Sequence, residues 1–262
     1  LFVADEMRQY FIDGFFHADP HPANLFFGPG GRIGYFDFGL IGEAGLMRRD
    51  FLRALFAFSQ NDVRAAADAL VDYGMRELRA EAGDLDAVEE RAIATVEEIM
   101  RDRLAAELRV ILGPWYDREE RNSSYVFGRI LLAAERFGVR IPHEVVMFFR
   151  ALSILDAVAL RLSPQFDMIH ALHRFFEEFP FEEAERLIEA REHADELGTL
   201  REGKVLPLPL EELHEYRARE EEERQIAKER FSALLAYYAE KYESVAEAMR
   251  REEEQARETK TG

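Results

Sequence analysis

The sequence contains no cysteine among its 262 residues. Disulfide bonds and thiolate metal sites are therefore excluded, although the absence of cysteine assigns no cellular compartment. The chain also lacks an apolar run of the roughly 18 to 20 residues that a membrane-spanning helix needs, and its first residues show no signal-peptide pattern. We therefore expect a cytoplasmic protein, either free in solution or peripheral to a membrane.

Basic residues are scarce in comparison with acidic ones. Lys and Arg number 34, Asp and Glu number 52, and the formal net charge is −18. Binding to nucleic acid requires a surplus of Lys and Arg to neutralise phosphates, so we expect no nucleic-acid partner. The 48% hydrophobic residues are nevertheless sufficient to build a sizeable core.

Helical periodicity dominates the sequence from Leu46 onward. Apolar residues recur at spacings of three and four, and glycine or proline stands where several of these patterns stop. We expect helices that end at Gly74 and Gly138, and a largely apolar, central helix between Pro142 and Pro164. The predicted helical segments are 51–58, 62–74, 85–112, 123–138 and 143–163.

The first part of the chain has a different pattern. Apolar side chains at helical spacing predict a helix over residues 3–16, which gives way to a proline-rich loop at about His17. LFF at 25–27 and RIGYF at 32–36 are β-prone runs separated by GPGG, which is typical of a hairpin. We expect no other strands, so the predicted fold class is mainly α with one small β-hairpin.

Two motifs flank this hairpin. HADPHPAN at 17–24 precedes it and DFG at 37–39 follows it, so Asp19, Asn24 and Asp37 recur in the order of a kinase catalytic loop and its metal-binding turn. Phosphoryl transfer needs a carboxylate to orient or deprotonate the acceptor, and oxygen ligands to hold Mg²⁺ on the phosphates of ATP. Asp19 suits the first role. Asn24 and Asp37 suit the second, because Mg²⁺ prefers carboxylate and amide oxygens.

The neighbours of these residues have simpler expected roles. Gly39 should give the backbone freedom after Asp37, and Phe38 should pack under the loop. His17 and His21 could form a metal pair, but the nearby oxygen ligands favour Mg²⁺ over zinc, so we expect both rings to hold the loop by hydrogen bonds. Asp, Asn and Pro are also ordinary loop residues, and DFG alone occurs by chance; it is the two motifs in order that favour a kinase.

The whole run GFFHADPHPAN…GYFDFGLIGEAG resembles the AarF/UbiB family of atypical kinases, whose usual sequence motif is close to GxFHADPHPGN followed by a strand and DFG. Ala23 stands where that family usually has glycine. The segments RRDFLRALFAFSQNDVRAAADALVDYG and RALSILDAVALRLSPQFDM are also similar to the family, so the resemblance covers about residues 1–170.

The resemblance implies an ATP- and Mg²⁺-dependent kinase or ATPase. Asp19 would be the catalytic aspartate, Asn24 and Asp37 would bind magnesium and nucleotide, and Gly39 would also lie at the ATP site. The family is linked to isoprenoid quinone biosynthesis, including that of ubiquinone, and to lipid homeostasis. Quinone-biosynthesis proteins or lipid substrates are therefore implied as partners.

The domain organisation combines this resemblance with the break in helical periodicity at TLREGKVLPLPL, residues 199–210, after which the composition becomes strongly charged. We expect a protein-kinase-like C-lobe over 1–180, a helical extension over 181–198, a linker over 199–210 and a charged amphipathic helical tail over 211–262. The glycine- or alanine-rich nucleotide loop, the strand lysine and the helix glutamate of a kinase N-lobe have no counterpart here, and the first residue is Leu. We therefore expect a phosphotransferase in the complete protein and a weak or inactive isolated chain.

The tail has apolar residues along one helical face between Arg230 and Arg251. They are Phe231, Leu234, Leu235, Tyr238, Tyr242, Val245 and Met249. We expect this face to dock on the lobe or to pair with another helix, which includes self-association. Binding to a membrane surface is the less favoured alternative, since the polar face is not mainly basic.

Two other functions fit part of the pattern. Small-molecule phosphotransferases of the aminoglycoside or choline kinase type share H-x-D-x-x-x-x-N and a following aspartate, but usually lack the Phe-Gly that follows Asp37 here. A non-catalytic module that binds nucleotide or a partner is the third hypothesis. The presence of Asp19, Asn24 and Asp37 together argues against a simple pseudokinase.

Overall fold

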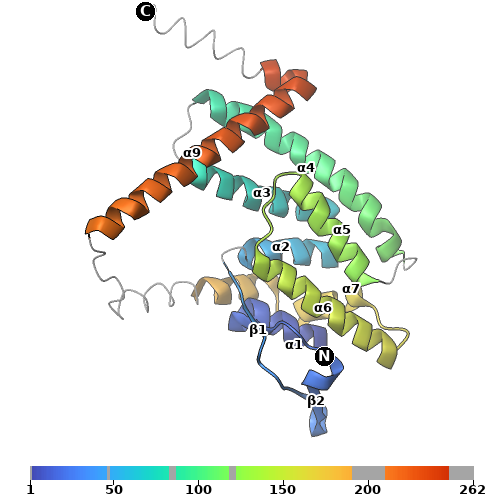
Figure 1. The fold of residues 1–262 in the computed structure, drawn as a ribbon. Coiled ribbons are helices and arrows are strands. Elements are labelled where there is room, and N and C mark those ends of the chain that lie inside the picture. Colours follow the sequence, from blue (N-terminus) through green and yellow to red (C-terminus); the bar gives the residue numbers. More distant parts are fainter. Residues whose placement is uncertain (1, 46–47, 83–86, 118–121, 191–209, 248–262) are drawn as a thin grey trace, which may run out of the picture. The chain divides into compact units, whose positions relative to one another are not determined.

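The computed structural model describes residues 2–45, 48–82, 87–117, 122–190 and 210–247. These residues are mainly helical, with two small antiparallel sheets near the N-terminus (Figure 1). The predicted fold class is therefore confirmed. No helix among the described residues has both the length and the apolar character needed to cross a membrane.

The chain divides into two compact units. One contains residues 1–70 and 104–197, and the other contains 71–103 and 198–262. The linker predicted over 199–210 lies outside the described residues except at Leu210, as does the end of the extension predicted over 181–198. The predicted domain boundaries therefore stay a prediction.

Most helices occur where periodicity predicts them. α6, His143–Leu162, fits between Pro142 and Pro164, and α5, Ser123–Arg136, is followed by Gly138 in the left-handed conformation (φ 79°). α3, Val63–Ala82, is the exception, because it continues through Gly74 instead of ending there. Glycine inside a helix costs only about 1 kcal/mol, which the following run MRELRAEA, rich in good helix formers, can offset. The helices are α2 Arg48–Ser59, α3 Val63–Ala82, α4 Ala87–Tyr116, α5 Ser123–Arg136, α6 His143–Leu162 and α7 Met168–Glu178.

The first helix ends earlier than predicted. α1, Phe2–Arg8, continues as a π-helical turn, Gln9–Asp13, and stops at Gly14, which has φ 80°. Glycine adopts this left-handed conformation without a Cβ clash, and it is a common helix terminator. The expected helix over 3–16 is therefore wrong at its end, where a strand begins.

The predicted hairpin is confirmed, but it is not the only pair of strands. β2, Leu25–Gly28, pairs antiparallel with β3, Arg32–Tyr35, across a turn at Pro29–Gly31. In addition, β1, Phe15–His17, pairs antiparallel with β4, Ile41–Glu43. The expectation of a single hairpin is wrong, because strands of three residues are too short to show a period of two.

The two strand pairs are nested. β1–β4 encloses β2–β3, so the connection 18–24 and the connection 36–40 both run between the outer and the inner pair. Two backbone hydrogen bonds join these connections: the Ala18 N–H donates to the Leu40 carbonyl (3.1 Å), and the Phe36 N–H donates to the Asn24 carbonyl (2.8 Å). The nesting thereby brings the HADPHPAN and DFG segments together.

An aromatic core anchors the outer pair. The ring of Phe148 on α6 lies 4.3 Å from that of Tyr10, 5.6 Å from that of Phe16 on β1 and 5.7 Å from that of Phe51 on α2, measured between ring centroids. All four side chains are buried. Burial of such rings is among the largest apolar contributions a side chain can make, so β1 is fixed to the helices directly before the connection 18–24.

Gly42 on β4 is the partner of Phe16 in the outer pair, and it has no room for a side chain. A Cβ placed on Gly42 would lie 2.2 Å from the Phe16 ring. We expect Gly42→Ala to lower the free energy of unfolding by about 2 kcal/mol, the usual effect of overpacking. Gly128→Ala, inside α5 with nothing within 4 Å of the added methyl, should instead stabilise by about 0.5–1 kcal/mol. Thermal melts of both variants test this, and equal melting temperatures would contradict it.

The second unit contains the tail helix. α9, Leu210–Lys241, is followed by helical residues 243–247. Its predicted apolar face is largely buried at Phe231, Leu235 and Tyr238; Met249 lies outside the described residues. An Arg103 guanidinium on α4 donates a hydrogen bond to the Tyr242 hydroxyl (2.8 Å). The tail thus pairs with another helix of the same chain, as one of the expectations had it.

Candidate active site

Asp19 lies on the first connection, where two basic groups approach its carboxylate. Oδ1 is 2.9 Å from Nη2 of Arg150 on α6, and Oδ2 is 3.7 Å from Nε2 of His21. The same guanidinium donates to the Ala18 carbonyl (3.4 Å). Arg150 therefore holds the backbone and the carboxylate of the loop together, while Asp19 keeps about 30% of its side-chain surface exposed.

His17 joins the two connections through its ring, which is buried. Nε2 lies 2.9 Å from the Phe36 carbonyl and 3.1 Å from the Asp37 carbonyl, and Nδ1 lies 3.3 Å from the backbone nitrogen of Asp19. Carbonyls can only accept, so Nε2 carries the proton and Nδ1 accepts the Asp19 N–H. The predicted hydrogen-bonding role of His17 is confirmed.

The rest of the loop is held by local hydrogen bonds. Nδ1 of His21 accepts the Ala23 N–H (3.2 Å), which confirms the predicted role of this ring as well. The buried side chain of Asn24 donates through Nδ2 to the Asp19 carbonyl (3.1 Å). Ala23 does not have a positive φ, so its methyl group fits where the family usually has glycine.

The DFG turn differs from expectation in two respects. Asp37 itself has the left-handed conformation (φ 54°), while Gly39 does not, so the backbone freedom is needed at Asp37. Asp and Asn tolerate this region better than most residues do. The Gly39 N–H donates to Oδ1 of Asp37 (3.2 Å). Phe38 does not pack under the loop, since 61% of its surface is exposed. Its ring lies at an angle to the His17 ring, with centroids 5.5 Å apart.

The residues of this site suit magnesium better than a transition metal. Among the described residues, no three His, Cys, Asp or Glu side chains gather into a metal site. Protein sites for Mg²⁺ often consist of one or two oxygen ligands, with phosphates and water completing the octahedron. Asn24 directs its Nδ2 to the Asp19 carbonyl, so Oδ1 is its free acceptor end. Together with the Asp37 carboxylate, this oxygen gives two groups on adjoining connections that could hold Mg²⁺.

Comparison with known proteins finds a family model over the part of the chain that carries both motifs. Residues 2–70 match the model of the ABC1 atypical kinase-like domain. The family supports a function of the kinase type in general terms, and the resemblance to AarF/UbiB kinases that the motifs predicted is confirmed.

Several proteins align with the ABC1-like chain well beyond residue 70. Protein ACTIVITY OF BC1 COMPLEX KINASE 8, chloroplastic, of Arabidopsis thaliana is 30% identical over 186 residues, which are 63% of this chain and 24% of that protein. A chloroplastic aarF domain-containing protein kinase of the same plant is 27% identical over 161 residues, 60% of this chain and 20% of that protein. An uncharacterized Synechocystis protein is 24% identical over 172 residues, 65% of this chain and 27% of that protein. The chain thus spans about a quarter of the length of these relatives. No solved structure matches it.

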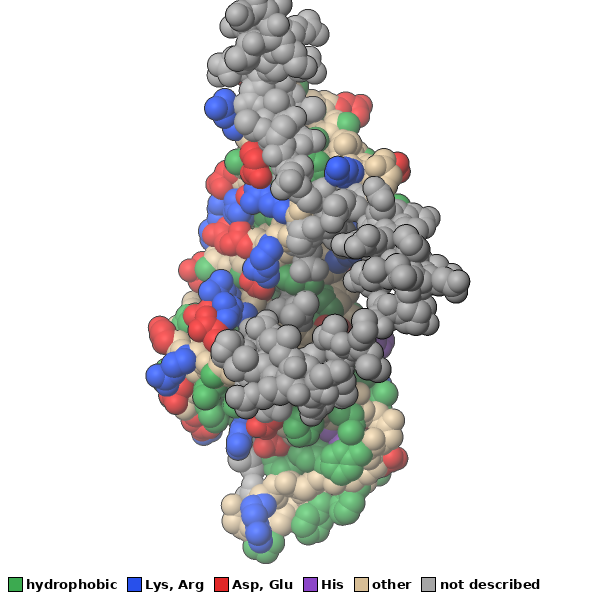
Figure 2. Space-filling view, turned by 90° about the vertical axis from the view of Figure 1, so that its left-hand side faces the viewer, with side chains coloured by type: hydrophobic (Ala, Val, Ile, Leu, Met, Phe, Trp, Pro, Cys, Tyr) green, Lys and Arg blue, Asp and Glu red, His purple; other side chains and the backbone are tan. Residues whose placement is uncertain are grey.

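Apolar side chains surround the ABC1-like site on the protein surface. Figure 2 shows hydrophobic side chains gathered at the lower end of the molecule, the end that carries the small sheets. The exposed members of the sheets and the DFG turn are Phe15, Phe26, Phe27, Phe36, Phe38, Leu40 and Ile41. Contiguous exposed apolar patches of this kind often mark surfaces that bind a ligand or another protein segment.

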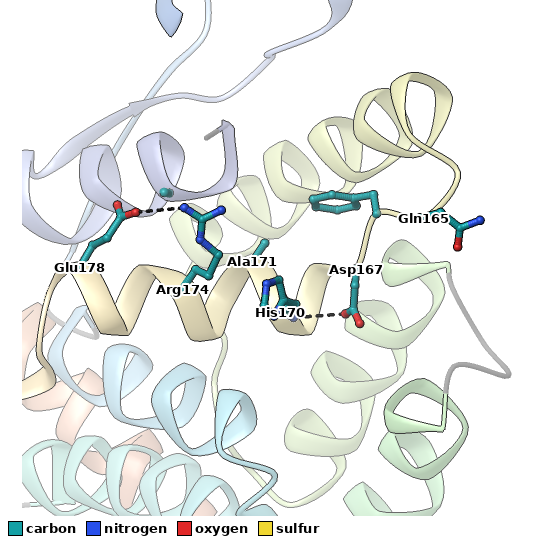
Figure 3. A pocket seen from close by; sticks show the side chains of 8 residues that line it. Gln165, Asp167, His170, Ala171, Arg174 and Glu178 are labelled. Atoms are coloured by element: carbon teal, nitrogen blue, oxygen red, sulfur yellow. Dashed lines mark hydrogen bonds and ion pairs between the residues drawn. The ribbon is translucent and has the colours of Figure 1, made fainter.

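A separate cavity of about 540 Å³ lies between α1 and α7, and the turn that precedes α7 also lines it (Figure 3). It is lined by Ala4, Gln165, Phe166, Asp167, His170, Ala171, Arg174 and Glu178. Arg174 and Glu178 pair with each other (3.4 Å), and Asp167 accepts the His170 N–H as the N-cap of α7. Asp19, Asn24 and Asp37 do not line this cavity, so the site of the ABC1-like motifs is elsewhere.

α1 carries a buried carboxyl group. Glu6 is fully buried, and neither carboxyl oxygen has a hydrogen-bond partner among the described residues. Burial raises the pKa of Glu6 well above its ordinary value of 4.5, and the neighbouring Asp5 raises it further. A neutral carboxylic acid costs less to bury than a carboxylate does, so Glu6 is protonated over a wider pH range in the folded protein than in the unfolded chain.

This raised pKa makes the stability depend on pH. Between the unfolded and folded pKa values the folded protein holds one more proton, so the free energy of unfolding falls as the pH rises from about 4.5. Glu6→Gln removes this proton linkage. We expect its melting temperature relative to wild type to increase from pH 4 to pH 8, because only the wild type loses stability as the pH rises. Glu182→Gln, at an exposed position of the same unit, should show a difference that does not change with pH. A pH-independent difference for Glu6→Gln would contradict the assignment.

Proposed function

We propose that the complete protein is an ATP- and Mg²⁺-dependent phosphotransferase or ATPase of the ABC1 type. The observation that carries this proposal is the nested strand pairs, because they bring the Asp19 loop and the Asp37 turn together with His17 hydrogen-bonded to both. Catalysis of phosphoryl transfer consists mainly of positioning and electrostatic stabilisation. A rigid junction between the catalytic loop and the metal-binding turn meets that need.

Each residue has a distinct role in the proposal. Asn24, through Oδ1, and Asp37, through its carboxylate, would hold Mg²⁺ on the nucleotide, and the Gly39 N–H would keep the Asp37 carboxylate oriented. Bound Mg²⁺ would neutralise charge on the phosphates. Asp19 would orient the acceptor hydroxyl or water, or accept its proton, with Arg150 fixing the carboxylate in place.

The exposed apolar residues beside the site support the proposal that another part of the complete protein covers this surface during catalysis. We propose that nucleotide and the N-lobe expected from the family resemblance lie over this surface, and that the chain alone is a weak catalyst. Supply of isoprenoid quinones or lipid homeostasis, with quinone-biosynthesis proteins or lipids as partners, belongs to the same proposal. So do a cytoplasmic or membrane-peripheral location, and self-association through the tail.

Turnover of radiolabelled ATP by the full-length protein tests the proposal. We expect release or transfer of the γ-phosphate that requires Mg²⁺ and stops when the ion is chelated. If purified full-length wild type bound no nucleotide with any divalent cation, the catalytic proposal would be wrong. Nucleotide binding without turnover would instead favour the non-catalytic module.

A further inference from the structure

We propose that Asp5, on α1, positions both halves of the site through Tyr35 and Gln9. This inference rests on the proposed function, since it concerns how the metal-binding turn is held. The carboxylate oxygen Oδ2 of Asp5 accepts two hydrogen bonds, from the Tyr35 hydroxyl (2.7 Å) and from Nε2 of Gln9 (2.9 Å). One atom on the helix thereby ties down two side chains that lead to different parts of the site.

Tyr35 leads to the metal-binding turn. It is the last residue of β3 and is two positions before Asp37. Its register partner on β2 is Leu25, the residue that follows Asn24. A hydrogen bond that fixes the end of β3 to α1 therefore limits movement of both proposed metal ligands. Hydrogen bonds to a charged acceptor are stronger than those between neutral groups.

Gln9 leads to the catalytic loop. Its Oε1 accepts the backbone N–H of His17 (3.1 Å) at the end of β1, while its Nε2 donates to Asp5. The amide thus has a donor and an acceptor partner in fixed positions, which sets its orientation. Through Gln9 the Asp5 carboxylate acts on the residue that precedes Ala18 and Asp19.

Tyr35 and Gln9 both contact His17. The imidazole of His17 stacks on the Tyr35 ring, with centroids 5.4 Å apart and an interplanar angle of 29°. The same imidazole bonds to the Asp37 carbonyl and to the Asp19 N–H. Asp5, Tyr35, Gln9 and His17 therefore form a closed ring of contacts. Partners of this kind, one step removed from a metal ligand, commonly change metal affinity by 10- to 100-fold when removed.

Tyr35→Phe in the full-length protein tests the proposal, because it removes one hydroxyl and keeps the stacked ring. The matched control is Tyr116→Phe, which removes a hydroxyl that donates to the Phe58 carbonyl (2.8 Å) away from the site. The first measurement is the affinity for Mn²⁺ in the presence of a non-hydrolysable ATP analogue. We expect Tyr35→Phe to weaken it about tenfold, and Tyr116→Phe to leave it unchanged.

The second measurement is the NMR signal of the His17 ring, which does not depend on catalysis. We expect the Nε2 proton of His17 to exchange faster and to shift in Tyr35→Phe, and to be unchanged in Tyr116→Phe. Asp5→Asn keeps an acceptor oxygen but removes the negative charge that strengthens both hydrogen bonds, so it should also weaken Mn²⁺ binding. It provides the test if Tyr35→Phe does not fold.

The outcomes separate the two proposals. If wild type binds Mn²⁺ with the analogue, but Tyr35→Phe and Asp5→Asn bind it equally well, the positioning role is overturned and the proposed function stands. If wild type binds no Mn²⁺ with the analogue, both are overturned. Weaker binding in Tyr35→Phe with normal binding in Tyr116→Phe supports both.

Discussion

Replacing Asp37 by Asn is expected to lower ATP turnover by the full-length protein about a thousandfold, which corresponds to roughly 4 kcal/mol of transition-state stabilisation. The amide has no negative charge to bind Mg²⁺ beside the phosphates. Asparagine tolerates the left-handed conformation found at this position, so the fold should persist. Turnover at saturating ATP and Mg²⁺, with a thermal melt of the same sample, gives the comparison.

Asp62→Asn is the matched control for this loss. Asp62 also lies in a turn, and its Oδ1 also accepts one backbone N–H, that of Ala65 (3.0 Å). Asparagine serves equally well as such a helix cap. We expect normal turnover in Asp62→Asn. If Asp37→Asn retained more than about a tenth of wild-type turnover, the assignment of Asp37 to the metal would be contradicted.

Replacing Asp19 by Asn is expected to lower the maximal rate about a hundredfold, in the range for loss of a general base or orienting carboxylate. The KM for ATP should change little, because Asp19 is assigned to the acceptor side and not to the nucleotide. The effect should therefore appear in kcat alone, which steady-state kinetics at several ATP concentrations can separate.

Asp13→Asn provides the comparison for Asp19. Each of these aspartates has one arginine partner, Arg8 at 3.8 Å for Asp13 and Arg150 at 2.9 Å for Asp19, and both are partly exposed. Ion pairs at the surface contribute at most about 1 kcal/mol to stability. Both variants should therefore melt close to wild type, and only Asp19→Asn should lose activity. Equal kcat values in the two variants would remove Asp19 from the proposed mechanism.

The order of the motifs and the hairpin between them could be predicted from sequence. Proline and glycine in GPGG mark the turn, and β-prone runs flank it, so β2 and β3 were predictable from local signals. The outer pair was not, because β1 and β4 have three residues each and pair across the whole inner hairpin. Gly42 is required opposite Phe16 because a side chain there would clash with the Phe16 ring. This requirement becomes evident only once the strand register is known.

The contacts that hold the site depend on residues distant in sequence. Arg150 reaches Asp19 from α6, and Asp5 reaches Tyr35 from α1. An arginine inside the most apolar helix was the available signal for the first contact. Tyr35, two positions before Asp37, gave no signal for the second. The positive φ at Asp37 and the exposure of Phe38 could not be predicted from the sequence either, since the tertiary surroundings determine both.

The position of a bound divalent ion decides whether Asn24 and Asp37 hold the metal. Crystals of the full-length protein grown with Mn²⁺ and a non-hydrolysable ATP analogue would locate the ion by its anomalous scattering. We expect a peak about 2.0–2.3 Å from both Oδ1 of Asn24 and a carboxylate oxygen of Asp37, with phosphate oxygens completing the coordination. A Mn²⁺–nucleotide complex bound with neither residue as a ligand would contradict it.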